Sequence, residues 1–241
     1  FSVQAAGNIV IDGHCEASQI EAGGDVIIRK GCQGKGLGKI IAGKSIVGQF
    51  FESAVLTAGK DVQATYLLNC QLKANGKLLV EGRKGVIIGG KTCAKLGVSC
   101  NGIGNIAEIA TVVSVGIDKE DMTAYQELQK KIEQTQAELQ TCENGLNKLM
   151  ANPVHDEKVS MMIQRLTRAV YTLKSSRKEL FSERNAQMEQ MTKQKEARIQ
   201  VSGRAYPGTL LFLNEDPFAI KEIYNNVEFV KHDNRIDTLA H

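Results

Sequence analysis

Short runs of alternating apolar and polar residues recur along the first half of the chain, and each run ends at a small residue. The runs are QIEA, KIIA, VLTA, QLKA and VIIG, which end at Ala22, Ala42, Ala58, Ala74 and Gly89. The intervals between these ends are 20, 16, 16 and 15 residues. Such alternation is typical of short, half-buried strands. A repeat of this length without helical periodicity predicts a β-solenoid, in which each coil stacks on the one before it.

A glycine follows each of these small residues, directly or one position later. Three of the glycines open GKS, GKD and GKT, and the residues after Ala74 read NGKL. Glycine suits sharp turns and places where two backbones approach closely. We therefore interpret the glycine-lysine pairs as corners of the solenoid.

Beyond residue 118 the apolar period changes to alternating steps of three and four residues. This spacing predicts a helix with an a/d heptad seam. The seam consists of Tyr125, Leu128, Ile132, Thr135, Leu139, Cys142, Leu146 and Leu149.

A second helix is predicted after ANPVHD (151–156), where Asn152–Pro153 breaks the first helix and Asp156 can cap the next. Its seam skips near Arg177 and then resumes. The predicted seam residues are Val159, Ile163, Leu166, Val170, Leu173, Leu180, Phe181, Met188 and Met191. Residues 118–150 carry four basic and seven acidic side chains (net −3), and residues 157–198 carry ten basic and five acidic (net +5). The opposite charges favour an antiparallel coiled-coil hairpin.

These patterns divide the chain into three parts. Residues 1–117 are predicted to form a parallel β-helix, and residues 118–200 a coiled-coil helical hairpin. Residues 201–241, which include VSGRAYPGTLLFL, are expected to return as strands that cap the β-helix, since an exposed coil end leaves strand edges unpaired. The fold class is thus mainly β with an α-helical insertion.

Composition predicts a cytoplasmic location and places few constraints on partners. The net charge is +3, with 23 glycines, 3 prolines and no tryptophan in 241 residues. The six cysteines form no C-x-x-C pair, and no apolar run approaches the ~20 residues of a membrane span. We expect reduced thiols and no membrane span. Because the chain begins at Phe1 rather than at methionine, we also expect an upstream domain.

Two segments match the phosphate-binding P-loop pattern G-x-x-x-x-G-K-[ST]: GKIIAGKS (38–45) and GVIIGGKT (85–92). A P-loop needs a strand before it and a helix after it, so that backbone N–H groups meet the phosphates. The residues that follow, IVGQF and CAKLG, read as strand. Nucleotide binding through Lys44 or Lys91 is therefore the weaker alternative.

Other candidate sites have simpler structural explanations. His14–Cys15 lacks further ligands at metal-binding spacing. Cys93 and Cys100 could face each other across a coil, but small buried apolar side chains are the simpler interpretation. Lys35 and Lys39 in GCQGKGLGK could form an anion-binding nest, although a solvated loop is the better explanation.

Basic and methionine side chains in the second helix are assigned to the hairpin itself. The basic run, which could grip a phosphate backbone, is expected to form ion pairs with the acidic first helix. It consists of Arg165, Arg168, Lys174, Arg177, Lys178 and Arg184. Met161, Met162, Met188 and Met191 are expected in the coiled-coil core.

The chain resembles the bacterial flagellar assembly protein A family. The resemblance runs through GNIVIDGHCEASQIEAGGDVIIRKGCQG, VEGRKGVIIGGKTCAKLGVSCNGIGNIAEIATVVSVG, the heptad region and VSGRAYPGTLLFL, and covers nearly the whole chain. It implies a right-handed parallel β-helix with a helical hairpin, preceded by an N-terminal domain. It also implies a cytoplasmic bacterial protein that is tied in some lineages to flagellar assembly or polar placement.

We therefore predict a non-enzymatic scaffold with no catalytic, cofactor-binding or metal-ligating residues. Its hairpin would bind protein partners or a second copy of the chain. The alternatives are a P-loop nucleotide-binding enzyme and a weak nucleic-acid-binding module, because residues 1–117 carry twelve basic and eight acidic side chains (net +4).

Overall fold

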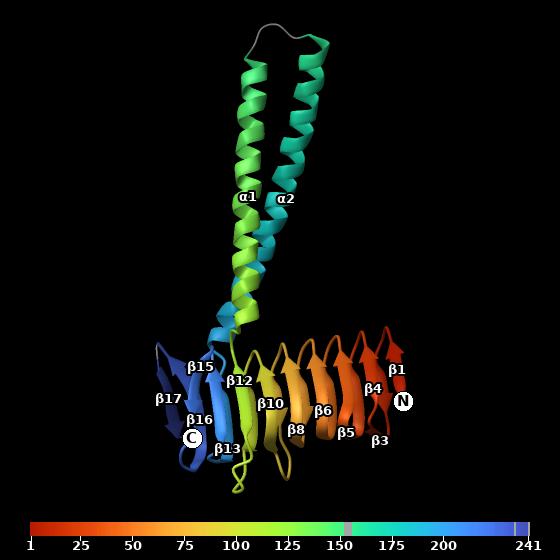
Figure 1. Ribbon diagram of the computed structural model, residues 1–241, viewed down its shortest axis with the longest axis vertical. Coiled ribbons are helices and arrows are strands. Elements are labelled where there is room, and N and C mark those ends of the chain that lie inside the picture. Colours follow the sequence, from red (N-terminus) through yellow and green to blue (C-terminus); the bar gives the residue numbers. More distant parts are fainter. Residues whose placement is uncertain (152–155, 234, 241) are drawn as a thin grey trace. The chain divides into compact units, whose positions relative to one another are not determined.

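The computed structural model describes residues 1–151, 156–233 and 235–240 (Figure 1). The strands of these residues belong to one hydrogen-bonded sheet system. They are β1 (Ser2–Ala5), β2 (Ile9–Ile11), β3 (His14–Glu16), β4 (Gln19–Ala22), β5 (Val26–Ala42), β6 (Ile46–Ala58), β7 (Val62–Ala64), β8 (Tyr66–Ala74), β9 (Leu78–Val80), β10 (Val86–Ala94), β11 (Val98–Ile103), β12 (Thr111–Val115), β13 (Ile199–Ala205), β14 (Thr209–Leu213), β15 (Asp216–Ala219), β16 (Tyr224–His232) and β17 (Arg235–Ala240). The helices are α1 (Lys119–Met150) and α2 (Glu157–Lys195).

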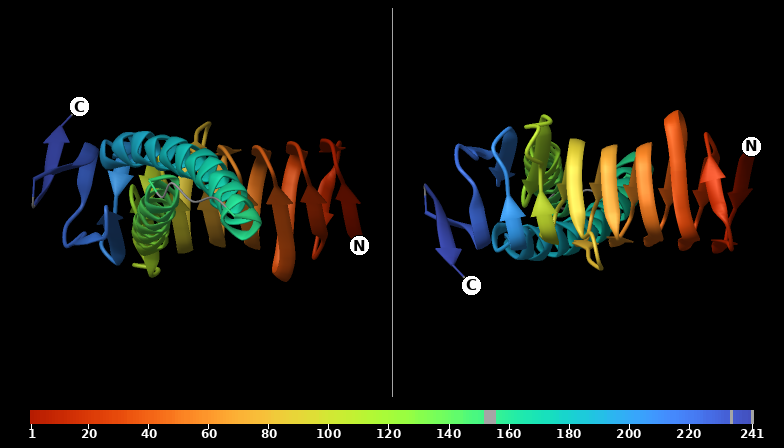
Figure 2. Two further views of the ribbon diagram at one scale, coloured as in Figure 1. Left: turned by 90° about the horizontal axis from the view of Figure 1, so that it is seen from above. Right: turned by 90° about the horizontal axis from the view of Figure 1, so that it is seen from below.

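The chain forms two compact units. One consists of Phe1–Asp118 together with the chain from Thr192 onward, and the other is Lys119–Met191. The first unit is a β-solenoid whose strands pair in parallel with those one coil earlier and one coil later. Figures 1 and 2 show these coils following one another in chain order from the N-terminus.

The predicted small residues do stack in register. Ala22 pairs with Ala42, Ala42 with Ala58 and Ala58 with Ala74, and each is at most 3% exposed. Directly after these alanines the coils lie very close together. A Cβ on Gly59 would stand 2.1 Å from the carbonyl oxygen of Gly43, so this corner accepts no side chain at Gly59 without a backbone shift. The solenoid predicted for the first half of the chain is confirmed.

The fifth predicted corner was placed wrongly. Ala94, not Gly89, pairs with Ala74, so this coil is 20 residues long rather than 15. Gly89 belongs to a different bend, at which residues of several coils have a left-handed backbone. The φ angles there are 44° at Ala17, 49° at Ser53, 52° at Asn69 and 69° at Gly89. Both bends select small residues, which explains the wrong register.

Inward-facing side chains form continuous rows through the stack. One row runs through Cys15, Cys32, Phe51, Leu67 and Ile87, each at most 1% exposed and in register with the next. Full burial of such a side chain contributes about 1.5–3 kcal/mol. Each row of the core therefore repeats one inward-facing apolar position from coil to coil.

After α2 the chain rejoins the stack. β13 pairs in parallel with β11, and β14 pairs in parallel with β12. The last strands reverse direction: β15 pairs antiparallel with β14, β16 with β13, and β17 with β16. Phe218, Tyr224 and Phe229 pack together there, with ring centroids 5.5–6.3 Å apart.

The helices are inserted in the chain between β12 and β13, at a corner that other coils form with three residues. Between Ala42 and Ile46, for example, the chain uses residues 43–45, whereas β12 and β13 are separated by residues 116–198. Among the described residues, neither helix contains a stretch long and apolar enough to span a membrane.

Candidate functional site

The seam of α1 lies where the heptad pattern placed it. Leu128, Ile132 and Leu139 are buried, and the other predicted positions from Tyr125 to Leu149 are half-buried. Most residues between them are exposed. One face of α1 therefore packs against other residues along its length.

The seam of α2 continues without the predicted skip. Beyond Leu173 the positions at steps of three and four are all half-buried: Arg177, Leu180, Arg184, Gln187 and Met191. Met188, which the skip would have placed in the seam, is 57% exposed. The prediction was wrong because two arginines and a glutamine interrupt the apolar pattern while the helix keeps its packing register.

Contacts between α1 and α2 run in antiparallel order. Lys174 Nζ lies 2.8 Å from Glu143 Oε1, and Arg177 Nη1 donates to Gln136 Oε1 at 2.9 Å. Nearer the connection, Leu166 Cδ1 would be 3.6 Å from a Cβ on Gly145. Figure 1 shows the two helices side by side. Because the Lys174–Glu143 pair is largely exposed, it contributes roughly 1 kcal/mol or less.

Arg184 is one of three polar residues in the α2 seam. Its Cζ lies 4.6 Å from the centroid of the Phe181 ring, and Nη2 donates to Asn185 Oδ1 at 3.1 Å. Its Nε is buried without a hydrogen-bond partner among the described residues. A buried donor left unpaired is destabilising. The unpaired Nε of Arg184 therefore offsets part of the stability that packing contributes at this position.

The start of α2 carries the predicted cap. The backbone N–H of Val159 donates to Asp156 Oδ1 at 2.8 Å, as expected for an N-cap residue. The predicted helix break at Asn152–Pro153 lies outside the described residues.

The outer side of α2 presents a stripe of basic and interface-type side chains. Consecutive members are three or four positions apart and are therefore neighbours on the helix surface. Met161, Arg165, Arg168 and Tyr171 lie opposite the seam, whereas Lys174 lies nearer α1, with which it pairs. This basic stripe consists of Lys158, Met161, Arg165, Arg168, Tyr171, Lys174 and Lys178, all exposed. Tyr171 is 78% exposed and Met161 51%. Residues 158–178 contain six basic and no acidic side chain.

Two predictions about the basic and methionine side chains of α2 were wrong. Of the stripe's basic side chains, Lys174 alone forms an ion pair with α1 in the described structure. Met161, Met162 and Met188 are more than half exposed and are not core residues. The signal that finds the stripe is a run of basic residues without an acidic one, in which Arg165 and Arg168 fall opposite the heptad seam.

The P-loop-like segments lack the geometry that phosphate binding requires. GKIIAGKS ends β5, turns at Gly43–Lys44 and leads into β6, and GVIIGGKT extends from Gly85 along β10. No helix begins after either segment. Gly43–Lys44 is a corner as predicted, but Gly90–Lys91 lies within β10, so that corner assignment was wrong.

The cysteines behave as core side chains rather than as ligands. Cys15 and Cys100 are buried, whereas Cys93 is half-exposed. Burial raises the pKa of Cys32 to about 11 and that of Cys100 to about 12, which keeps both thiols protonated at neutral pH. Within the described residues, no group of three or more His, Cys, Asp or Glu side chains is placed to hold a metal ion.

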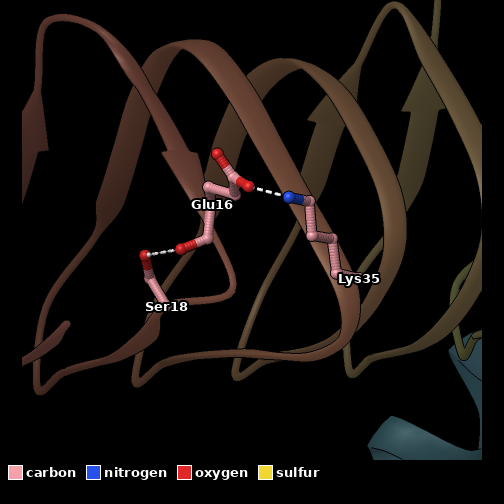
Figure 3. Close-up of polar contacts among 3 residues, drawn as sticks. All are labelled: Glu16, Ser18 and Lys35. Carbon is pink, nitrogen blue, oxygen red and sulfur yellow. Dashed lines mark hydrogen bonds and ion pairs between the residues drawn. The ribbon is translucent and has the colours of Figure 1, made fainter.

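The glycine-rich GCQGKGLGK segment closes on its neighbouring coil. The ammonium of Lys35 pairs with the Glu16 carboxylate, and the Ser18 hydroxyl donates to the backbone oxygen of Glu16 at 2.8 Å (Figure 3). Lys35 and Gly36 both have positive φ, of 50° and 76°. Because Glu16 already neutralises Lys35, this loop is poorly suited to binding an anion.

The fold and the helical insertion agree with one known family. A model of the flagellar assembly protein A beta solenoid domain matches residues 1–236 of the 241. The chain belongs to this family. The matched range spans α1 and α2. Comparison with curated proteins and with solved structures gives no match.

Proposed function

We propose that this member of the flagellar assembly protein A family is a non-enzymatic scaffold whose helical unit binds protein partners. In this proposal a right-handed β-helix carries α1 and α2 as an antiparallel coiled-coil hairpin, as the seam and the inter-helix contacts support. The observation that carries the proposal is the exposed basic stripe. Tyr, Met and Arg side chains are enriched at protein interfaces, and here they lie on a helix whose other face is occupied by α1.

The family name supports a link with flagellar assembly. The protonated, buried thiols suit a reducing compartment, which supports the cytoplasm as the location. The polar seam around Arg177 and Arg184 supports a further role in specificity, because a buried polar residue can fix register or oligomeric state in a coiled coil.

The test removes the helical unit at the corner where it enters the solenoid. Residues 116–198 are replaced by a three-residue corner of the Gly-Lys-Ser type, and both proteins are used to capture partners from lysate of the source cells. Circular dichroism of the shortened protein checks that the strands remain folded. We expect a partner that only the complete chain retains.

Self-association is measured on the same two proteins by analytical ultracentrifugation. A concentration-dependent dimer of the complete chain that disappears in the shortened chain would identify a second copy as the partner. Equal partner capture by both proteins would refute the role assigned to the helices and move recognition to the solenoid.

A further inference from the structure

Charged side chains are distributed unevenly along α2. Six basic and no acidic side chains fall within residues 158–178. Lys174 is paired with Glu143 across the two helices, and Arg177 is bonded to Gln136. The remaining basic side chains of the stripe form no ion pair with any described residue: Lys158, Arg165, Arg168 and Lys178.

Large apolar side chains are interleaved with these charges. Met161 precedes Arg165 by four positions, and Tyr171 follows Arg168 by three, so each lies beside a guanidinium on the helix surface. Both are at least half exposed. Apolar anchors surrounded by charged groups are the usual composition of a protein–protein interface, with a buried centre and a polar rim.

We propose that the basic stripe of α2 is a docking site for an acidic amphipathic helix of a partner protein. This inference rests on the proposed function and names the chemistry of the partner. Glutamate or aspartate side chains of the partner would pair with Arg165 and Arg168, and apolar residues on the same face would cover Met161 and Tyr171. The complementary charge would also accelerate association.

The same observations disfavour other occupants. A second copy that docked through the same stripe would bring like charges together, and these repel. A bilayer-surface helix separates an apolar face from a polar one, whereas here the apolar face of α2 is directed toward α1 and the outer side mixes the two kinds of residue. The stripe offers nucleic acid a single aromatic ring for base stacking, that of Tyr171.

The test uses the complete chain and a fluorescent synthetic peptide with glutamates flanking a leucine face. Anisotropy at physiological salt is expected to show saturable binding. A scrambled peptide of the same composition should bind at least tenfold more weakly, because it carries the charge without the apolar face. Arg165→Glu with Arg168→Glu should weaken binding of the ordered peptide by about tenfold or more, equivalent to at least 1.4 kcal/mol.

Two further variants separate charge from apolar contact. Met161→Ser with Tyr171→Ser should weaken binding of the ordered peptide and leave that of the scrambled one unchanged. The matched control is Lys130→Glu with Lys131→Glu on exposed positions of α1, which changes the net charge equally and should leave binding intact. Circular dichroism checks the helix content of each variant.

Several results would overturn the inference. These are absence of peptide binding, equal binding of the scrambled peptide, and equal loss in the Lys130 and Lys131 control. Tighter, stripe-dependent binding of a short DNA duplex or of anionic vesicles would overturn it in favour of those occupants. If the peptide fails while partner capture still depends on residues 116–198, this inference falls and the proposed function stands.

Discussion

Replacing Gly59 with alanine tests whether close backbone approach determines the corners of the solenoid. The added Cβ would stand 2.1 Å from the oxygen and 2.9 Å from the carbonyl carbon of Gly43. Real Cβ contacts essentially never fall below 3.0 Å, so the coils must separate locally by at least 0.9 Å (3.0 − 2.1). The backbone bond from Gly59 N–H to the Ala42 oxygen, 2.9 Å long, lies at the same place and would be strained.

The expected loss of stability follows from three terms. Overpacking of this kind is destabilising by about 1–3 kcal/mol, and a weakened hydrogen bond by roughly 0.5–1.5 kcal/mol. Alanine reduces the conformational freedom of the unfolded chain, which offsets about 0.4–1 kcal/mol. The net loss for Gly59→Ala is therefore about 2 kcal/mol, a large share of the ~5–15 kcal/mol by which domains are stable.

The measurement is urea unfolding of the complete chain, followed by far-ultraviolet circular dichroism. Gly7→Ala is the matched control, because a Cβ at Gly7 meets no heavy atom within 4 Å. It should change the unfolding free energy by about 0.5 kcal/mol or less. A Gly59→Ala protein as stable as the wild type, or an equal loss in Gly7→Ala, would refute the argument from close approach.

Three other predictions concern the helices and the buried thiols. Gly145→Ala should stabilise the helical unit by about 0.8–1.0 kcal/mol, because glycine is a poor helix former and the new Cβ meets Leu166 at an ordinary 3.6 Å; no gain in urea unfolding would contradict this. Asp156→Ala should destabilise the same unit by about 0.5–2 kcal/mol through loss of the cap, whereas Asp156→Asn, which retains a capping oxygen, should not. The raised pKa of Cys100, about 12, means that the unfolded chain releases this proton first, so the unfolding free energy should fall as pH rises from about 9 toward 12. Cys100→Ala should flatten that fall, and an unchanged pH profile would show that the thiol does not contribute.

The repeat was readable from the sequence because inward and outward positions alternate along the short strand segments that precede each corner. Ala42, Ala58 and Ala74 recur at one corner, and the glycines after Ala42 and Ala58 stand against the backbone of the preceding coil. The sequence could not distinguish that corner from the left-handed bend at Asn69 and Gly89, because both favour small residues. The pairing of Ala94 with Ala74 is set by the strand register of the structure and could not be predicted from the sequence.

The helical region shows a similar limit. The seam of α1 is apolar enough to follow through all its turns, but Arg184 looks like a surface residue and nevertheless lies in the seam of α2. The sequence prediction also overestimated ion pairing between the two helices. Net charges of −3 and +5 suggested that the helices neutralise each other, yet pairing depends on individual side-chain positions, and Arg165 and Arg168 lie on the side away from α1.

The insertion of the helices at a corner has a consequence for the order of folding. Strands up to β12 need partners that lie within about one coil of sequence, so they can pair as soon as they leave the ribosome. β13 instead pairs with β11 across a separation of about one hundred residues, as between Ser202 and Cys100. Closing a long flexible loop carries an entropic penalty that slows folding. Because the contacts between α1 and α2 run in antiparallel order, we expect pairing of the helices to shorten the effective loop and to lower this penalty for the last coils.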